Sequence, residues 1–216
     1  MEAGLVAETL SELAEDAAIS AVHIGMLGSG EVAGVVAKFI RDRKLRNLVL
    51  DPVLKSSSGA DLLDSAGKSL LVKELFPIAS VITPNVAEAA AFTGLKVSNL
   101  EEAGAAAAKL HKLGAAAVVV TGGHLAETAD LLSVSTATGI WTKVFRGKKI
   151  RLTSTHGTGC AFATSLACHL ALGQELAEAV RAAKTYVAEA IAHAYPVGRG
   201  VGPVNHLYAI GTMESK

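Results

Sequence analysis

The sequence has 216 residues, half of them hydrophobic, and its 20 Lys and Arg residues balance its 20 Asp and Glu residues. A chain of this length buries one sizeable core, so we predict a single domain over residues 1–216, and the even charge disfavours nucleic acid as a partner. No apolar run approaches the about 20 residues of a membrane helix, and the N-terminus lacks the basic-then-apolar order of a signal peptide, so we expect a cytoplasmic protein without a membrane partner.

Helices and strands are predicted to alternate through the first 120 residues. Apolar residues at helical spacing predict helices over 5–13, 31–42, 65–75 and 100–113, with a short helix after Pro84. Short apolar runs predict strands over 21–25, 47–50, 80–83 and 115–120. Because strands joined through helices pair in parallel with right-handed crossovers, we predict an α/β fold with a mostly parallel sheet and helices on both faces.

The pattern changes in the last third of the chain. Short strand-like segments over 130–134, 140–145 and 149–152 predict antiparallel hairpins. Two helices, over 159–172 and 175–194, are then separated by Gly173. Cys160 and Cys168 lie about 12 Å apart by helical rise on the first of them, which is too far for a disulfide, so both are predicted to be free thiols.

Several polar and glycine-containing segments directly follow the predicted parallel strands. Ligands of parallel sheets bind beyond the carboxyl ends of the strands, so these segments are predicted to share one ligand-binding edge. The segments are Gly25-Met26, Asp51-Pro52-Val53, Thr83-Pro84-Asn85 and Thr121-Gly122-Gly123.

A short glycine motif opens the first of the two late helices. Gly157, Thr158 and Gly159 allow backbone N–H groups to approach an anion, and the helix N-terminus adds partial positive charge, so we predict a phosphate site. Cys160 lies in the first turn, where the same field lowers the pKa of a thiol, and we predict that it acts as a base. The alternative is a loop that leads into a buried helix, with Cys160 as a small core residue.

Taken in order, these motifs resemble the hydroxymethylpyrimidine/phosphomethylpyrimidine kinases of the ribokinase-like superfamily. The resemblance runs from about residue 15 to Leu207 and is most specific over Thr155-His156-Gly157-Thr158-Gly159-Cys160. Members of the family begin with a further strand and a glycine-rich segment, so the resemblance implies a ribokinase-like fold that is N-terminally shortened. The other matching segments are 25–27, 51–53, 83–89, 122–124 and 202–206.

The resemblance also implies roles for individual residues. The turn of Gly157, Thr158 and Gly159 would hold the transferred phosphate, and Cys160 stands where related enzymes carry an aspartate base. Residues implied to bind ATP are Asp51, Asn85, Glu88, Thr121 and Gly123, with Glu88 reaching Mg²⁺ directly or through water. Residues implied to contact the pyrimidine are Met26, Val53 and Cys160.

Each of these roles has a plainer alternative. Glu88 is also an ordinary acidic residue of a first helical turn, Asp51 a cap of the turn at Pro52, and Met26 a core side chain. His124 and His156 sit in tight turns where an imidazole bonds to backbone, and we give them little weight as catalysts.

The function implied by the resemblance is the ATP- and Mg²⁺-dependent phosphorylation of 4-amino-5-hydroxymethyl-2-methylpyrimidine, or of its monophosphate, in thiamine biosynthesis. The alternatives are a kinase for pyridoxal or a related vitamin, and a nucleotide-binding remnant without catalysis. The shortened sheet is expected to leave an exposed edge, which favours a homodimer.

Overall fold

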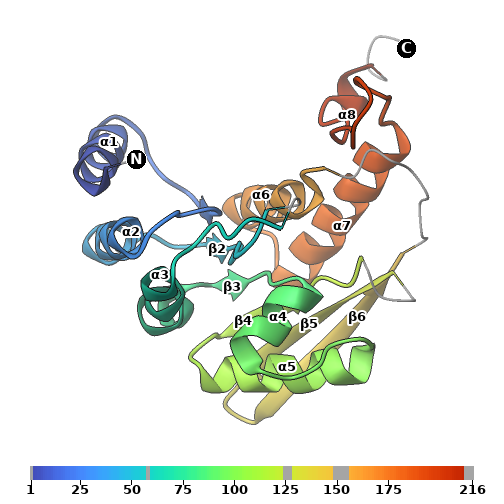
Figure 1. The fold of residues 1–216 in the computed structure, drawn as a ribbon, viewed down its shortest axis with the longest axis horizontal. Helices are drawn as coiled ribbons and strands as arrows, with labels where there is room; N and C mark the ends of the chain where they lie inside the picture. Colours follow the sequence, from blue (N-terminus) through green and yellow to red (C-terminus); the bar gives the residue numbers. More distant parts are fainter. Residues whose placement is uncertain (1, 57–58, 124–127, 148–155, 212–216) are drawn as a thin grey trace.

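The computed structural model describes residues 2–56, 59–123, 128–147 and 156–211. Its centre is a six-stranded sheet in which the strands follow one another in chain order. The first four strands pair in parallel, and the last two are antiparallel (Figure 1). The strands are β1 (Val22–Ile24), β2 (Leu48–Leu50), β3 (Val81–Ile82), β4 (Ala117–Val120), β5 (Ala129–Thr136) and β6 (Gly139–Arg146).

Alternation of side chains along the strands creates two separate cores. In β2, Leu48 and Leu50 pack into one cluster of buried side chains, whereas Val49 packs into the other. The same division separates Val118 from Val119 in β4. Because successive strand residues point to opposite faces, continuous apolar runs are needed where both faces are covered, as these strands show.

One face of the sheet is covered by the helices that connect the parallel strands. They are α2 (Gly30–Asp42), α3 (Ser65–Leu70), α4 (Val86–Thr93) and α5 (Leu100–Lys112). Phe76, Leu75 and Leu110 are fully buried in the core on this side. Helix α1 (Ala3–Asp16) lies against α2 at the outer end of this layer and buries none of its own residues (Figure 1).

The other face is covered by α6 (Thr158–Ala171) and α7 (Leu176–Ala192). Phe162 and Leu166 of α6 and Val180 of α7 pack with Val49 and Val119 of the sheet. A last short helix, α8 (Tyr208–Gly211), lies beyond the end of α7 (Figure 1). The described part of the chain therefore confirms the predicted α/β fold with helices on both faces of a mostly parallel sheet.

The predicted elements agree with the structure with three exceptions. The helix predicted over 65–75 is α-helical only as α3, then continues as a π-helix over Leu71–Leu75 and a 3₁₀-helix over Phe76–Ile78, where Pro77 enters the helical turn. Helix α8 was not predicted, and the strand predicted over 149–152 lies outside the described residues. No helix in the described ranges is long and apolar enough to cross a membrane.

Candidate functional site

The carboxyl ends of the four parallel strands form one edge, as predicted, and backbone hydrogen bonds hold it together. The Asp51 N–H donates to the Ile24 carbonyl at 2.8 Å, so the end of β2 is fixed to the end of β1. The Thr121 N–H donates to the Pro84 carbonyl at 3.0 Å, and Thr121 forms a parallel bridge with Asn85. The segments after β1, β2, β3 and β4 are therefore neighbours.

Two carboxyl groups are buried at this edge. Asp51 is 6% exposed and Glu88 is 7% exposed. Burial, and then the charge of Glu88, raise the pKa of Asp51 from its ordinary 3.8 to about 7. Burial also raises the pKa of Glu88, although hydrogen bonds from Asn85 and from the Leu54 backbone act against this. A pair of this kind stores repulsion that a bound cation relieves.

Asn85 and Glu88 position each other through a capping box at the start of α4. The Glu88 N–H donates to Asn85 Oδ1, and the Asn85 N–H donates to Glu88 Oε2, both at 2.9 Å. Glu88 is thus the first-turn helix acid that the plainer interpretation named. It is also the charged neighbour of Asp51, so the capping box fixes a carboxylate at the candidate site.

Helix α6 covers the face of the sheet opposite to α4, and its N-terminus lies at the same edge of strand ends as the start of α4. Its N-cap is Gly157, whose φ of 86° lies in the left-handed region that glycine adopts without steric cost. No side chain among the described residues caps this N-terminus. A Cβ on Gly159 would lie 3.8 Å from Asp51 Oδ2, so the first turn of α6 faces the Asp51 carboxyl group. An anion that binds to the helix amides would lie beside the carboxyl pair.

The pKa of the Cys160 thiol is raised, and the prediction of a lowered pKa is therefore wrong. Partial burial raises it first, the Asp51 carboxylate raises it further, and Glu88 acts in the same direction. The Cys160 backbone N–H opposes this shift by donating to the sulfur. The fold partly buries the thiol and brings two carboxyl groups beside the start of α6, and burial first and then their charges raise its pKa.

A cavity of about 510 Å³ extends from Cys160 along the outer side of α6. It runs from Gly157 to Cys168 and is bordered by Tyr186 of α7 and by His206. The two other residues predicted to contact a pyrimidine do not line it: Met26 is 64% exposed and Val53 is half-buried. Both follow strands of the same edge, but the structure does not bring them into this cavity with Cys160.

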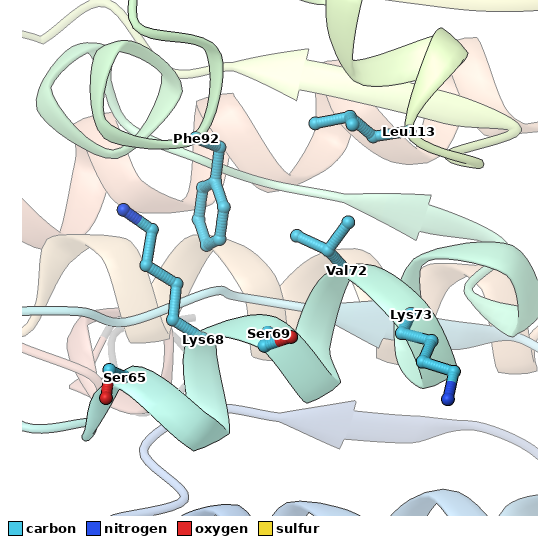
Figure 2. Close-up of a pocket in the computed structure, with 7 residues that line it drawn as sticks. All are labelled: Ser65, Lys68, Ser69, Val72, Lys73, Phe92 and Leu113. Atoms are coloured by element: carbon cyan, nitrogen blue, oxygen red, sulfur yellow. The ribbon is translucent and has the colours of Figure 1, made fainter.

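A second cavity, of about 480 Å³, lies on the other face of the sheet (Figure 2). The α3 segment borders it on one side, and Phe92 and Leu113 border it on the other. Lys68 Nζ lies 5.3 Å from the Phe92 ring centroid and donates to the Ala91 carbonyl at 2.8 Å. No residue predicted to act at the candidate site lines this cavity.

The turn before α6 is held by the glycine-rich C-terminal segment. The His156 N–H donates to the Gly202 carbonyl at 3.2 Å, and His156 forms a parallel bridge with Pro203. These contacts use the main chain of His156 and not the imidazole to which the prediction referred. His124 and Thr155 lie outside the described residues, while Thr121 and Gly123 follow β4 at the edge, as predicted.

Comparison with known proteins identifies the family. A family model described as phosphomethylpyrimidine kinase matches residues 1–205. The hydroxymethylpyrimidine/phosphomethylpyrimidine kinase of Haemophilus influenzae is 39% identical over 91% of this chain and 74% of its own length. The chain belongs to the phosphomethylpyrimidine kinase family.

Two further relatives of this phosphomethylpyrimidine kinase family member extend the comparison. The thiamine biosynthesis bifunctional protein ThiED of Geobacter sulfurreducens is 40% identical over 98% of the chain, which spans only 43% of that longer protein. The crystal structure of an ADP complex of Bacillus subtilis pyridoxal kinase superposes with a TM-score of 0.87 at 30% identity, over 97% of this chain and 78% of the other. The fold is therefore ribokinase-like, as predicted, and the Bacillus subtilis structure is that of a kinase with bound ADP.

The structure of this phosphomethylpyrimidine kinase family member also shows contacts near the edge for residues that were not predicted to belong to the site. His23 of β1 lies beside the edge, where its Nδ1 is 3.0 Å from Thr164 Oγ1 of α6. Its buried Nε2 has no hydrogen-bond partner among the described residues, and burial lowers the pKa of the ring. Asp130 and Lys184 form a largely buried ion pair, and Asp130 also accepts a hydrogen bond from the Gly122 N–H. No local pattern marks these contacts, because their partners are distant in the chain.

Proposed function

We propose that this protein transfers the γ-phosphoryl group of ATP to the hydroxymethyl group of 4-amino-5-hydroxymethyl-2-methylpyrimidine, or to the phosphate of its monophosphate. The proposal rests on one observation above all. The N-terminus of α6, which no described side chain caps, faces the buried Asp51 carboxyl group at Gly159. An anion-binding helix and a buried acidic pair therefore meet at the strand ends, which is the combination that phosphoryl transfer requires.

In this proposal, the residues at the start of α6 hold the phosphoryl group and activate its acceptor. The amides that follow Gly157 donate to the phosphoryl oxygens, whose negative charge the helix N-terminus stabilises. Cys160 takes the proton from the acceptor oxygen as the new O–P bond forms and the bond between phosphorus and the ADP oxygen breaks. Burial and then the charges of Asp51 and Glu88 raise the pKa of this thiol, so compensation of those charges would favour the thiolate that accepts the proton.

We also propose Mg²⁺ as a cofactor. Asp51 and Glu88 provide hard oxygen ligands of the kind that Mg²⁺ prefers, and their raised pKa values favour neutralisation by a cation. Within the described ranges, no group of three or more His, Cys, Asp or Glu side chains is arranged to hold a metal ion alone. The protein would thus hold Mg²⁺ only together with ATP phosphates, where the ion neutralises their charge.

The decisive experiment measures ATP consumption with the pyrimidine and Mg²⁺ for the wild type, Cys160→Ala and Cys168→Ala. Both cysteines are free and exposed on α6, which makes Cys168 a matched control. We expect kcat to fall by about 10²-fold or more in Cys160→Ala, because a general base is lost, and to change little in Cys168→Ala. Equal turnover in Cys160→Ala and wild type would remove Cys160 from its role.

A second candidate function is the phosphorylation of pyridoxal. The similarity to Bacillus subtilis pyridoxal kinase over 97% of this chain favours it, since one fold accommodates both hydroxymethyl heteroaromatic rings. Competing the two substrates in one reaction gives their kcat/KM ratio directly, and we expect the pyrimidine to be preferred. Calorimetry that detects ATP binding but no binding of either ring would instead indicate a non-catalytic nucleotide-binding protein.

We further propose that the protein is a cytoplasmic homodimer. Helix α1 supports association, because it buries none of its residues and leaves Leu5 and Leu13 each 57% exposed. Light scattering after size exclusion measures the state directly. A monomer at micromolar concentration would contradict the dimer without affecting the proposed reaction.

A further inference from the structure

Asp130 and Lys184 form a buried ion pair near the end of β4. Lys184 Nζ of α7 lies 2.7 Å from Asp130 Oδ2 of β5, and their side chains are 16% and 9% exposed respectively. Ion pairs elsewhere in the described part of the chain, such as Arg41–Glu74 and Lys55–Asp61, leave at least one partner well exposed. A buried pair carries a large desolvation cost, and an apolar replacement is often as stable. Stability alone therefore does not explain its position.

The second oxygen of Asp130 shows what the pair holds. Asp130 Oδ1 accepts from the buried Gly122 N–H at 2.9 Å. Gly122 lies between Thr121 and Gly123, and the Thr121 N–H is itself fixed to the Pro84 carbonyl. The turn after β4 is thus held from two sides, by β3 and by Asp130. Pro84, which accepts the first of these hydrogen bonds, directly precedes Asn85 of the capping box with Glu88.

The side chain of Lys184 also lies close to Gly147, which directly follows β6. A Cβ on Gly147 would lie 3.0 Å from Lys184 Cε, so the lysine stem passes over a position where a larger residue would collide with it. The Gly147 N–H donates to the Thr128 carbonyl at 2.7 Å, just before β5 begins. The lysine stem therefore passes beside the segment that follows β6 before its ammonium group reaches Asp130.

We propose that Asp130 is a positioning residue for the nucleotide, which acts through the Gly122 amide, and that Lys184 makes this possible by neutralising it. The inference rests on the proposed function and on the ATP-binding role that the resemblance implies for Thr121 and Gly123. An unpaired carboxylate so close to these phosphates would repel them. Paired with Lys184, Asp130 fixes the turn through a charge-assisted hydrogen bond and adds no net charge.

The test uses two double variants to distinguish the role of the Asp130 acceptor oxygen from the role of the Asp130 charge. Asp130→Asn with Lys184→Met keeps an acceptor for the Gly122 N–H without any charge, whereas Asp130→Ala with Lys184→Met removes both. Because a lost hydrogen bond leaves a buried N–H unpaired, we expect the KM for ATP to rise about tenfold or more in the second double variant. In the first it should stay within about threefold of wild type. The KM for the pyrimidine should change little in both.

Lys184→Met alone provides a second measurement if the alanine double variant fails to fold. It leaves the Asp130 charge uncompensated, so we expect a raised KM for ATP that Asp130→Asn restores. Arg41→Met, which breaks the ion pair with Glu74 far from the edge, is the matched control and should leave the KM for ATP unchanged. If the variants lower only the melting temperature, or if KM changes equally for both substrates, the positioning role is wrong.

Hydrogen exchange of the Gly122 amide keeps this test independent of the proposed reaction. We expect faster exchange in Asp130→Ala with Lys184→Met than in Asp130→Asn with Lys184→Met, whether or not the wild type turns over. Equal exchange in the two double variants would overturn the inference. Absence of turnover in the wild type together with the expected exchange difference would instead count against the proposed reaction alone.

Discussion

The protonation of Asp51 leads to a quantitative prediction for the variant Asp51→Asn. Burial and the neighbouring Glu88 raise the pKa of Asp51 from 3.8 to about 7 in the folded protein. Each pH unit between these values costs the folded state about 1.4 kcal/mol, because the unfolded chain has released a proton that the folded chain retains. The contribution of Asp51 to the free energy of unfolding of the wild type is fully present below pH 4. It is lost as the pH rises to about 7.

The variant keeps the size of the side chain and removes the titration. We therefore expect Asp51→Asn to be more stable than wild type, with a difference that grows by about 2–3 kcal/mol between pH 5 and pH 8. Urea unfolding in EDTA at several pH values measures this difference, and the contributions of His residues cancel because both proteins contain them. Asp61→Asn is the control for the substitution itself, since this aspartate is exposed and does not belong to the candidate site.

A difference between Asp51→Asn and wild type that stays constant from pH 5 to pH 8 would refute this reasoning. It would mean that Asp51 is ionised in the folded protein at no cost, and that the edge does not store the repulsion inferred for it. The proposed attraction of a cation by the carboxyl pair would then lose its physical basis.

Three further predictions test the site. Mg²⁺ with ATP should raise the wild-type melting temperature at pH 8 but not that of Asp51→Asn, and equal shifts would contradict the proposed metal role. Gly157→Ala should cost about 1–2 kcal/mol in urea unfolding because of its left-handed φ, whereas Gly34→Ala inside α2 should be neutral or stabilising; equal effects would refute the backbone argument. Asn85→Ala and Asn99→Ala should each lose about 1 kcal/mol as N-caps, but only the former should raise the KM for ATP, and equal KM values would contradict its site role.

Most of the fold was predictable because its signals are local. The apolar runs at β2 and β4 and the helical spacing over α2 and α5 reflect burial on one face or both, and each is visible in a short window of sequence. The parallel order follows from alternation of strands and helices, and it places Asp51, Asn85 and Thr121 on one edge. The π-helical continuation of α3 was not predictable, because its hydrogen bonds depend on packing rather than on periodicity.

The sequence named candidate residues for the site but not their surroundings. The glycines before Cys160 indicated an anion-binding turn, and the structure gives Gly157 the predicted kind of backbone. The predicted direction of the Cys160 pKa was wrong, because it depends first on burial and then on Asp51 and Glu88, which are distant from Cys160 in the sequence. The exposure of Met26 could not be predicted either, because a sequence does not indicate which loop side chains line the same cavity.

The sequence by itself determined which segments form strands and helices, where the strands end, and that glycine opens α6, because these depend on neighbours within a few residues. Only the tertiary structure decided that the start of α6 faces Asp51 and that Glu88 raises the pKa of Asp51 in addition to burial. The tertiary structure also decided that Lys184 neutralises Asp130, although 54 residues separate them in the chain. Electrostatic interactions depend on distances through space and on burial, and the chain sets neither until its layers have packed.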